Sequence, residues 1–194
     1  MRAALLTPNE VAALAATSKT VVEKALEQKV FGAGRAAAGN RRLLPLHAVA
    51  VAAAAKSLGR RLSVRDKKLV ARKLAALSPS ALKTAEIELA LGLILRVGAL
   101  ARDAIERAER YVSDREAFIE VAEGVQGGRP VIKGARLTVS AIHGRLSTGD
   151  TIETLLEDYP DVPRRAFEAA LLYAQTHPQV GRPAARRRGP ARAA

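Results

Sequence analysis

The chain has 194 residues, a formal net charge of +13 and no cysteine. This length allows one or two small domains with real cores, and the lack of cysteine excludes disulfides, thiolate catalysis and cysteine-based zinc sites. Aromatic residues make up only 3% of the chain, so Ala, Leu, Val and Ile must build cores of closely packed helices. Glu10 interrupts the N-terminal segment before a secretory apolar run forms, and no run approaches the roughly 18 residues of a membrane span. We expect a cytoplasmic protein without membrane contacts.

The positive charge is unevenly distributed. Residues 1–62 carry ten Lys or Arg against three acids, and residues 177–194 carry five Arg and no acid. Residues 115–176, in contrast, carry seven basic residues against nine acids. Basic charge gathered in the N-terminal part and the tail is typical of a protein that binds a polyanion or an acidic protein surface.

The N-terminal part begins with a strong helix signal. Thr7 to Glu10 reads T-P-N-E, a capping box with Pro at the first helical position. Ala16-Thr17 is a tight connection, and Ser18 caps a second helix. Its predicted buried stripe is Val22, Ala25 and Leu26, and its predicted outer face is Lys19, Thr20, Glu23 and Lys24. Two short helices joined in this way predict a helix-turn-helix.

A small hairpin, or wing, is predicted after these helices. Val30-Phe31, the Gly- and Ala-rich residues 32–40, and Arg41 to Leu44 supply its arms, with basic residues on the return arm. A helix over 46–58 follows and stops at Gly59. The succession of helix, turn, helix, wing and helix resembles the DNA-binding domain of MerR and excisionase-like proteins.

The middle of the chain gives less definite signals. Residues 64–77 form a basic helix stopped by Ser78-Pro79, and residues 99–111 form a charged amphipathic helix. Between them, residues 86–97 place apolar side chains at alternate positions around Gly92, which predicts paired strands. A helix is the alternative, because short apolar runs are ambiguous. The predicted apolar face, which we expect to form a homodimer, consists of Ile87, Leu89, Leu91, Leu93, Leu95 and Val97.

The segment from Gly127 to Tyr173 has the most specific pattern. A Gly-Gly-Arg-Pro turn leads into a strand pair over Pro130 to Val139 around Gly134. Three short helices are then predicted: one from Ser140 to Gly149, one capped by Thr151 and stopped by Pro160, and one opened by Asp161 and Pro163. The fold class is therefore mainly α with small β elements: an N-terminal winged helix-turn-helix and a C-terminal β-hairpin with three homeodomain-like helices.

This segment resembles the family known as domain of unknown function 433, in which P-V-I-x-G is followed by an acidic D-Y-P motif. The matching positions, in order, are Gly128, Pro130, Val131, Ile132, Gly134, Arg136, Leu137, Val139, Gly149, Thr151, Glu153, Leu156, Asp158, Tyr159 and Pro160. Ala135 stands where Thr is usual, and His143 where an aliphatic residue is usual. Members of the family resemble antitoxins of VapBC-type toxin-antitoxin modules, so the resemblance implies a PIN-type nuclease toxin as partner.

Catalysis is not expected. His47, His143 and His177 stand in three separate contexts without metal-ligand spacing, and Gly127-Gly128 lacks the Lys-Ser/Thr of a phosphate loop. Asp158 and Asp161 flank a Pro, where helix capping explains both. We therefore predict no enzyme activity, metal or cofactor.

Nucleic-acid and toxin binding are the predicted functions. The candidate DNA-binding residues are Lys19, Thr20 and Lys24 on the second helix and Arg41 and Arg42 on the wing, with Arg35 a weaker candidate. Arg164 and Arg165 leave a DNA role open for the C-terminal helices. The tail is expected to be disordered until bound, and its candidate toxin-binding residues are Arg182, Arg186, Arg187, Arg188 and Arg192. A nonspecific polyanion arm is the alternative for the tail.

We therefore expect an antitoxin that binds a PIN-type nuclease and represses its own promoter as a homodimer or higher even oligomer. The predicted division is 1–62 for DNA binding, 63–114 for connection and dimerisation, 115–176 for the antitoxin module and 177–194 for the tail. The alternative is a free-standing MerR-like regulator that senses a small ligand. A ligand-sized apolar pocket in the C-terminal module would favour that alternative.

Overall fold

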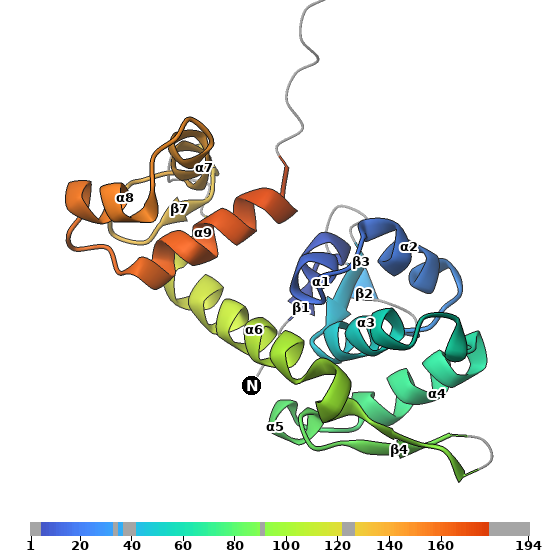
Figure 1. The fold of residues 1–194 in the computed structure, drawn as a ribbon. Coiled ribbons are helices and arrows are strands. Elements are labelled where there is room, and N and C mark those ends of the chain that lie inside the picture. Colours follow the sequence, from blue (N-terminus) through green and yellow to red (C-terminus); the bar gives the residue numbers. More distant parts are fainter. Residues whose placement is uncertain (1–4, 33–34, 37–41, 90–91, 122–126, 179–194) are drawn as a thin grey trace, which may run out of the picture.

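The computed structural model describes residues 5–32, 35–36, 42–89, 92–121 and 127–178, and it is mainly helical (Figure 1). The principal helices are α1 (Pro8–Leu14), α2 (Lys19–Glu27), α3 (His47–Leu58), α4 (Val64–Ala75), α5 (Pro79–Leu82), α6 (Val97–Phe118), α7 (Val139–Ser147), α8 (Ile152–Asp158) and α9 (Arg164–Thr176). The strands are β1 (Leu5–Leu6), β2 (Arg35–Ala36), β3 (Arg42–Pro45), β4 (Glu86–Glu88), β5 (Ile94–Arg96), β6 (Ile119–Glu120) and β7 (Val131–Ile132). The predicted fold class, mainly α with small β elements, is confirmed at this level.

The buried apolar side chains form two clusters. One runs from Leu6 to Val112 and the other from Ile119 to Ala170. The predicted segments 1–62 and 63–114 therefore share one core, because α3 packs along both α4 and α6. The predicted boundary after residue 114 falls inside α6, which crosses it without interruption and carries the C-terminal module (Figure 1).

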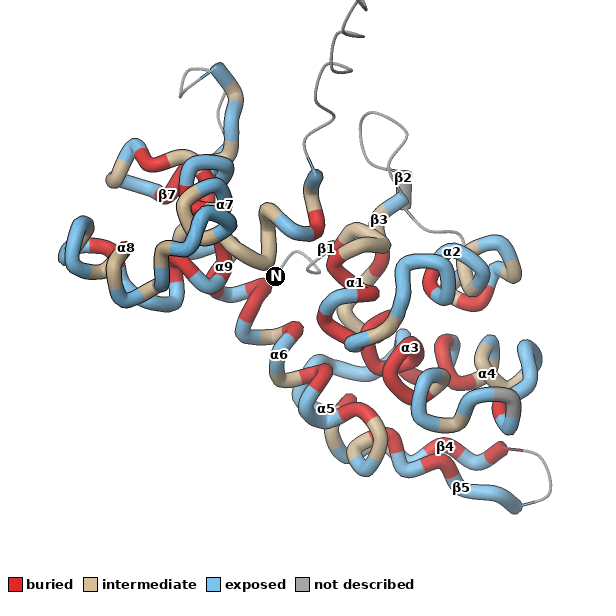
Figure 2. The backbone as a smooth tube through the Cα atoms, turned by 45° about the horizontal axis from the view of Figure 1, so that its top comes forward, coloured by how far each residue is buried: buried red, intermediate tan, exposed pale blue. Residues whose placement is uncertain are grey.

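Helix α3 is the centre of the N-terminal core. Its residues from Ala48 to Ala54 are all buried, and the tube in Figure 2 is red along this stretch. A helix built from Ala and Val can be approached closely on several sides, which is why α1, α4 and α6 all pack against it. Gly59 ends the helix with φ +55°, a conformation in which glycine carries little penalty. The predicted helix over 46–58 is thus confirmed.

The region predicted as a wing forms a three-stranded sheet, one strand more than the predicted hairpin. β3 pairs antiparallel with β2, and it also pairs with β1, which joins Leu5 to Pro45 and Leu6 to Leu44. Leu6 and Leu44 are fully buried, so this third strand anchors the wing to the core. Two-residue strands lack a visible alternation, and the sequence reading therefore missed β1.

The segment from Glu86 to Arg96 is a strand pair, which decides against the helical alternative. Ile87 lies opposite Leu95, and both are buried. Leu93, predicted on the same apolar face, is instead 62% exposed, although Leu89, whose N–H donates to the Leu93 carbonyl, is buried. Val97, also predicted in a strand, opens α6, and Leu91 lies outside the described residues.

The C-terminal module contains the predicted three helices. Thr138, two residues before the predicted start at Ser140, caps α7 by accepting a hydrogen bond from the Ala141 N–H, so Val139 belongs to the helix and not to a strand. β7 pairs with β6 at the end of α6, and Thr138 forms only a single bridge to Val131. Gly134, with φ +78°, lies in the turn between Val131 and Thr138. Thr151 caps α8, as predicted.

Candidate nucleic-acid interface

The first two helices are held by their predicted local signals. Thr7 Oγ1 accepts from the Glu10 N–H at 3.2 Å, and Glu10 Oε2 accepts from the Thr7 N–H at 2.6 Å. Ala16 has φ +50°, and the Thr17 N–H donates to the Ala12 carbonyl at 2.9 Å, so the connection turns within a few residues. Buried Val22 then anchors α2. Ser18 precedes α2 as predicted, but its side chain makes no capping hydrogen bond.

The predicted outer face of α2 is confirmed as an exposed surface. Lys19, Thr20 and Lys24 are all exposed. Lys19 Nζ lies 3.3 Å from Glu23 Oε1, and their side chains are 60% and 48% exposed, so solvent weakens this pair. Within the described residues, Lys24 makes no ion pair. Its charge is therefore available to a partner.

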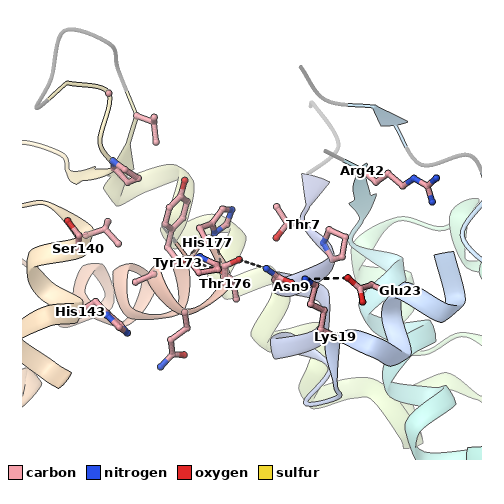
Figure 3. A pocket seen from close by; sticks show the side chains of 18 residues that line it. Thr7, Asn9, Lys19, Glu23, Arg42, Ser140, His143, Tyr173, Thr176 and His177 are labelled. Atoms are coloured by element: carbon pink, nitrogen blue, oxygen red, sulfur yellow. Dashed lines mark hydrogen bonds and ion pairs between the residues drawn. The ribbon is translucent and has the colours of Figure 1, made fainter. Parts of the chain in front are cut away.

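The wing adds a further cation to this surface. Arg42 begins β3, is exposed, and makes no ion pair with any described residue. Arg41 lies outside the described residues, and only the backbone of Arg35 is described, as part of β2. Arg42 and Lys19 thus come from different elements to the same side of the molecule (Figure 3).

These two cations line a cleft of about 1230 Å³ between the N-terminal part and the C-terminal module. Thr7, Asn9 and Glu23 lie on the same side as Lys19, and Ser140 and His143 of α7 lie across from them (Figure 3). The end of α9 closes the base, from Tyr173 to Pro178. Sequence reasoning missed this cleft because its lining comes from two distant parts of the chain, residues 7–42 and residues 121–178.

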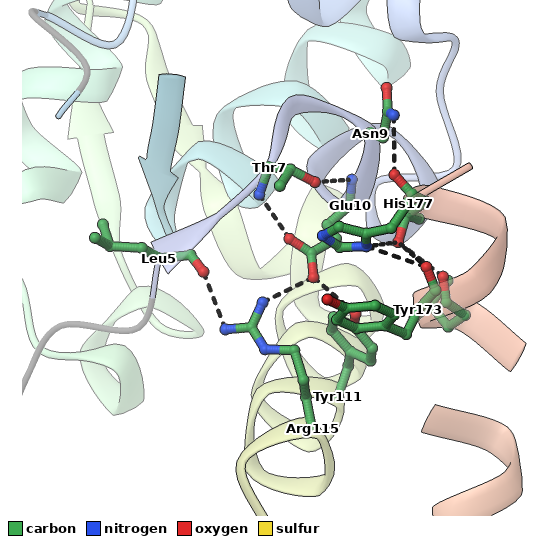
Figure 4. Close-up of polar contacts among 10 residues, drawn as sticks. Leu5, Thr7, Asn9, Glu10, Tyr111, Arg115, Tyr173 and His177 are labelled. Atoms are coloured by element: carbon green, nitrogen blue, oxygen red, sulfur yellow. Dashed lines mark hydrogen bonds and ion pairs between the residues drawn. The ribbon is translucent and has the colours of Figure 1, made fainter. Parts of the chain in front are cut away.

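A polar network links α1 to α6 and to α9 (Figure 4). Glu10 is fully buried, and its Oε1 accepts from Tyr111 Oη and from Arg115 Nη1, each at 2.7 Å. Arg115 Nη2 also donates to the Leu5 carbonyl at 3.0 Å. Asn9 Nδ2 donates to the Thr176 carbonyl at 2.9 Å and so ties α1 directly to α9. The capping box revealed Glu10 but gave no sign of these distant partners.

The network also changes the ionisation of its members. Burial raises the pKa of Tyr111, and the neighbouring Glu10 carboxylate raises it further. Burial lowers the pKa of Arg115, but the Glu10 charge and hydrogen bond outweigh this and leave it above the ordinary value. Tyr111 therefore stays a neutral donor and Arg115 a cation at physiological pH.

Arg164 and Arg165, considered for DNA contacts, are engaged within the protein. Arg165 Nη2 lies 2.5 Å from Oδ1 of Asp114, which is buried on α6. Arg164 donates to Glu153 on α8 and lowers the pKa of that carboxyl. The start of α9 thus holds the module together, and α7 is the helix that the module presents to the cleft.

The structure also places the other polar residues singled out in the sequence. Asp158 ion-pairs with Arg145, which also binds Asp150, so it joins α7 to α8 instead of capping a helix. His47 begins α3, and burial lowers its pKa. His143, which stands where the family usually has an aliphatic residue, is half-buried and lines the cleft. Nowhere in the described ranges do three or more His, Asp or Glu side chains gather as metal ligands.

The tail arginines Arg182, Arg186, Arg187, Arg188 and Arg192 lie outside the described residues. The first two residues of the predicted tail, His177 and Pro178, line the cleft. The ring of His177 stacks on Tyr173 with 4.0 Å between centroids and an interplanar angle of 8°. Among the described helices, none is long and apolar enough to cross a bilayer.

Comparison with known proteins gives one family and one relative. The chain is 30% identical over 81 residues to "Uncharacterized protein y4eO" of Sinorhizobium fredii, which covers 42% of this chain and 36% of that protein. The chain thus matches about a third of its curated relative's length. No solved structure matches. The family model described as "Protein of unknown function (DUF433)" matches residues 119–174, which confirms the resemblance predicted for the C-terminal module.

Proposed function

We propose that this protein is a DNA-binding antitoxin: it represses its own promoter through the N-terminal part and binds a PIN-type nuclease through the C-terminal module and tail. The observation that carries the DNA-binding role is the exposed face of α2, with Lys19, Thr20 and Lys24, beside Arg42 of the wing. Of the two carboxylates on α2, Glu23 and Glu27, Glu23 is paired with Lys19. A surface of this kind attracts a polyanion.

The arrangement of the elements supports a division of roles. In a helix-turn-helix the start of the second helix meets base edges in the major groove, and a wing contacts phosphates. Thr20 lies in the first turn of α2 and is assigned to base contact, whereas Arg42 is assigned to phosphate. Lys19 and Lys24 flank Thr20, and we assign them to supply positive charge to either kind of contact, with bases or with phosphates.

The DNA-binding role is tested with the full-length protein and a labelled 30-base-pair duplex from upstream of its own reading frame. Fluorescence anisotropy gives Kd at several salt concentrations. Arg42→Ala should weaken all sequences alike and lower the slope of log K against log salt by about 0.9, the value for one phosphate. Thr20→Ala should instead alter the preference for the promoter over a scrambled duplex, by up to about 1–3 kcal/mol.

Two controls sharpen this test. Lys24→Glu should weaken binding, whereas Lys68→Glu, the same change at an exposed residue of α4 outside the cleft, should not. If the protein acts as a dimer, a footprint should show two half-sites about 34 Å apart. Equal binding by the wild type, Lys24→Glu and Arg42→Ala would overturn the assignment.

The toxin-binding role is supported by the family match over residues 119–174 and by the five arginines that follow the module. The family resemblance implies a PIN-type nuclease, whose acidic site would hold Mg²⁺. Arginine forms bidentate pairs with carboxylates, so the tail is suited to neutralising such a site. The module supplies the folded docking surface, and the tail supplies charge.

A chain ending at His177 separates docking from inhibition. It should co-purify with the nuclease encoded beside it and yet inhibit that nuclease poorly. Replacing Arg186, Arg187 and Arg188 by Lys should restore inhibition only in part, because Lys lacks the bidentate fork. Full inhibition by the shortened chain at equal occupancy would assign inhibition to the folded module and leave the tail a nonspecific arm.

The runner-up function is a MerR-like regulator that senses a small ligand. The cleft of about 1230 Å³ beside α2 favours it, since a ligand there would lie next to the proposed DNA-binding helix. However, the cleft lies between the two parts and not in the apolar core of the C-terminal module, where such a pocket was expected. Isolation of the native protein with its bound partners distinguishes the two functions.

A further inference from the structure

We propose that the cleft is a two-sided seat for duplex DNA, in which Ser140 and His143 of the C-terminal module contact the phosphate backbone while α2 and the wing contact the same duplex from the other side. This inference rests on the proposed DNA binding and extends it to a second wall. Ser140 and His143 lie on one side of the cleft, and Lys19 and Arg42 lie on the other (Figure 3).

The charge of the lining suits a polyanion. Among the described residues that line the cleft, Glu23 is the one acidic residue, and it lies 3.3 Å from Lys19. Arg42 adds an unpaired positive charge within the described residues, and Ser140 and His143 add hydrogen-bonding groups. Ser, Arg and Lys are among the residues that commonly bind phosphate oxygens in protein–DNA interfaces.

The size and openness of the cleft favour DNA over a small ligand. Small-molecule sites are typically apolar cavities of about 300–1,000 Å³ that enclose most of the ligand. This cleft has about 1230 Å³, and Lys19, Arg42, Ser140 and Gln175 on its lining are exposed to solvent. A cleft that is open to solvent matches the edge of a macromolecule better than it matches an enclosed ligand.

The two walls are also fixed relative to each other. The Asn9–Thr176 hydrogen bond joins α1 to α9 beside the cleft, and the Glu10–Arg115 pair joins α1 to α6. Phosphate contacts from a preformed surface cost less ordering entropy than contacts from mobile segments. DNA that reaches Lys19 and Arg42 therefore meets the α7 wall already in place.

The first turn of α7 and that of α8 provide a matched test. Ser140 is the second residue of α7 and lines the cleft, whereas Thr154 is the third residue of α8, is half-buried, and lies outside the cleft lining. Glutamate is tolerated at both positions, because acidic residues are favourable in the first turn of a helix. The two substitutions change the charge of the same module by the same amount.

Anisotropy is measured with full-length protein and a 30-base-pair duplex from upstream of its reading frame, at low salt. Ser140→Glu and His143→Glu should each raise Kd about tenfold. Each should also make the slope of log K against log salt shallower by about 0.9, the value for one lost phosphate contact. Ser140→Arg should lower Kd. Thr154→Glu and Thr154→Arg should leave Kd within about twofold of the wild type, the effect of a remote surface charge.

The outcomes separate this inference from the proposed function. If Arg42→Ala and Lys24→Glu weaken binding but both Ser140 variants leave Kd unchanged, DNA binding stands and the second wall is overturned. If Ser140→Glu leaves DNA affinity intact but abolishes co-purification of the neighbouring nuclease, the cleft belongs to that protein and the inference is wrong. If the wild type does not bind the duplex, both proposals fail together.

Discussion

Arg115 Nη1 lies 2.7 Å from Glu10 Oε1, and this pair joins the first turn of α1 to the last turn of α6. Glu10 is fully buried and also completes the capping box of α1. One carboxylate thus serves a local role at a helix start and a long-range role between the two parts of the molecule. The position of the proposed DNA-binding helices relative to the C-terminal module depends on this contact.

Arg115→Met is expected to lower the free energy of unfolding by about 3–5 kcal/mol, because it leaves the buried Glu10 carboxylate without its cation. Adding Glu10→Gln should recover part of this loss, since the amide carries no charge to be compensated. Lys19→Met, which breaks an exposed pair, should cost about 0.5 kcal/mol or less. Urea unfolding measures all three; a double variant no more stable than Arg115→Met would contradict this account.

Gly98→Ala is expected to destabilise the protein by about 1–3 kcal/mol, the cost of overpacking a filled site. A Cβ at Gly98 would lie 2.1 Å from the Lys83 carbonyl oxygen, which is backbone and has little freedom to move. Gly144→Ala is the control, since a Cβ there meets nothing within 4 Å. In the middle of α7 it should stabilise by up to about 1 kcal/mol. If Gly98→Ala and Gly144→Ala shift the unfolding temperature in the same direction, the expected difference between the two sites is refuted.

Leu93→Asp and Ile94→Asp are expected to reduce self-association, because these side chains are 62% and 54% exposed on the β4–β5 hairpin. Leu95→Asp should instead unfold the protein, since Leu95 is buried in its own core. Val64→Asp, at an apolar residue 37% exposed on α4, is the control. Sedimentation velocity measures the assembly. A dimer that survives both hairpin changes would place the interface elsewhere, with the C-terminal module as the next candidate.

His47 is expected to make stability fall as the solution becomes acidic. Burial lowers its pKa below the ordinary 6.5, so the folded state resists a proton that the unfolded chain accepts. Stability should therefore be full above about pH 6.5 and decline as the pH falls from there toward the lowered pKa of the folded state. Urea unfolding across this range should show a shallower decline for His47→Gln. If His47→Gln has the same pH profile of stability as the wild type, groups other than His47 cause the decline in acid.

The helix starts were predictable because the groups that decide them lie within four residues of each other. Thr7 and Glu10 exchange hydrogen bonds across three residues. Thr151 caps the start of α8, and Gly59 ends α3. The exposed face of α2 was predictable for a similar reason, since one buried anchor, Val22, sets the orientation of a short helix.

Elements that depend on distant partners were not predictable in this way. β1 exists because Leu6 pairs with Leu44, and α6 extends to Phe118, beyond the predicted Tyr111, because α9 packs along its second half. Leu93 follows the same alternation as Leu95, yet only Leu95 meets the core. Periodicity indicates which side chains share a face, but it does not show how far along the strand that face is covered.

By itself the sequence determined the local structure: the order of the helices, their caps, the basic face of α2 and the family resemblance of the C-terminal module. Only the tertiary structure decided what faces that basic surface. The packing of α9 on α1 and α6 brings Ser140 and His143 opposite Lys19 and Arg42. Such contacts follow from how apolar surfaces fit together across the whole chain, and no local pattern of residues encodes that fit.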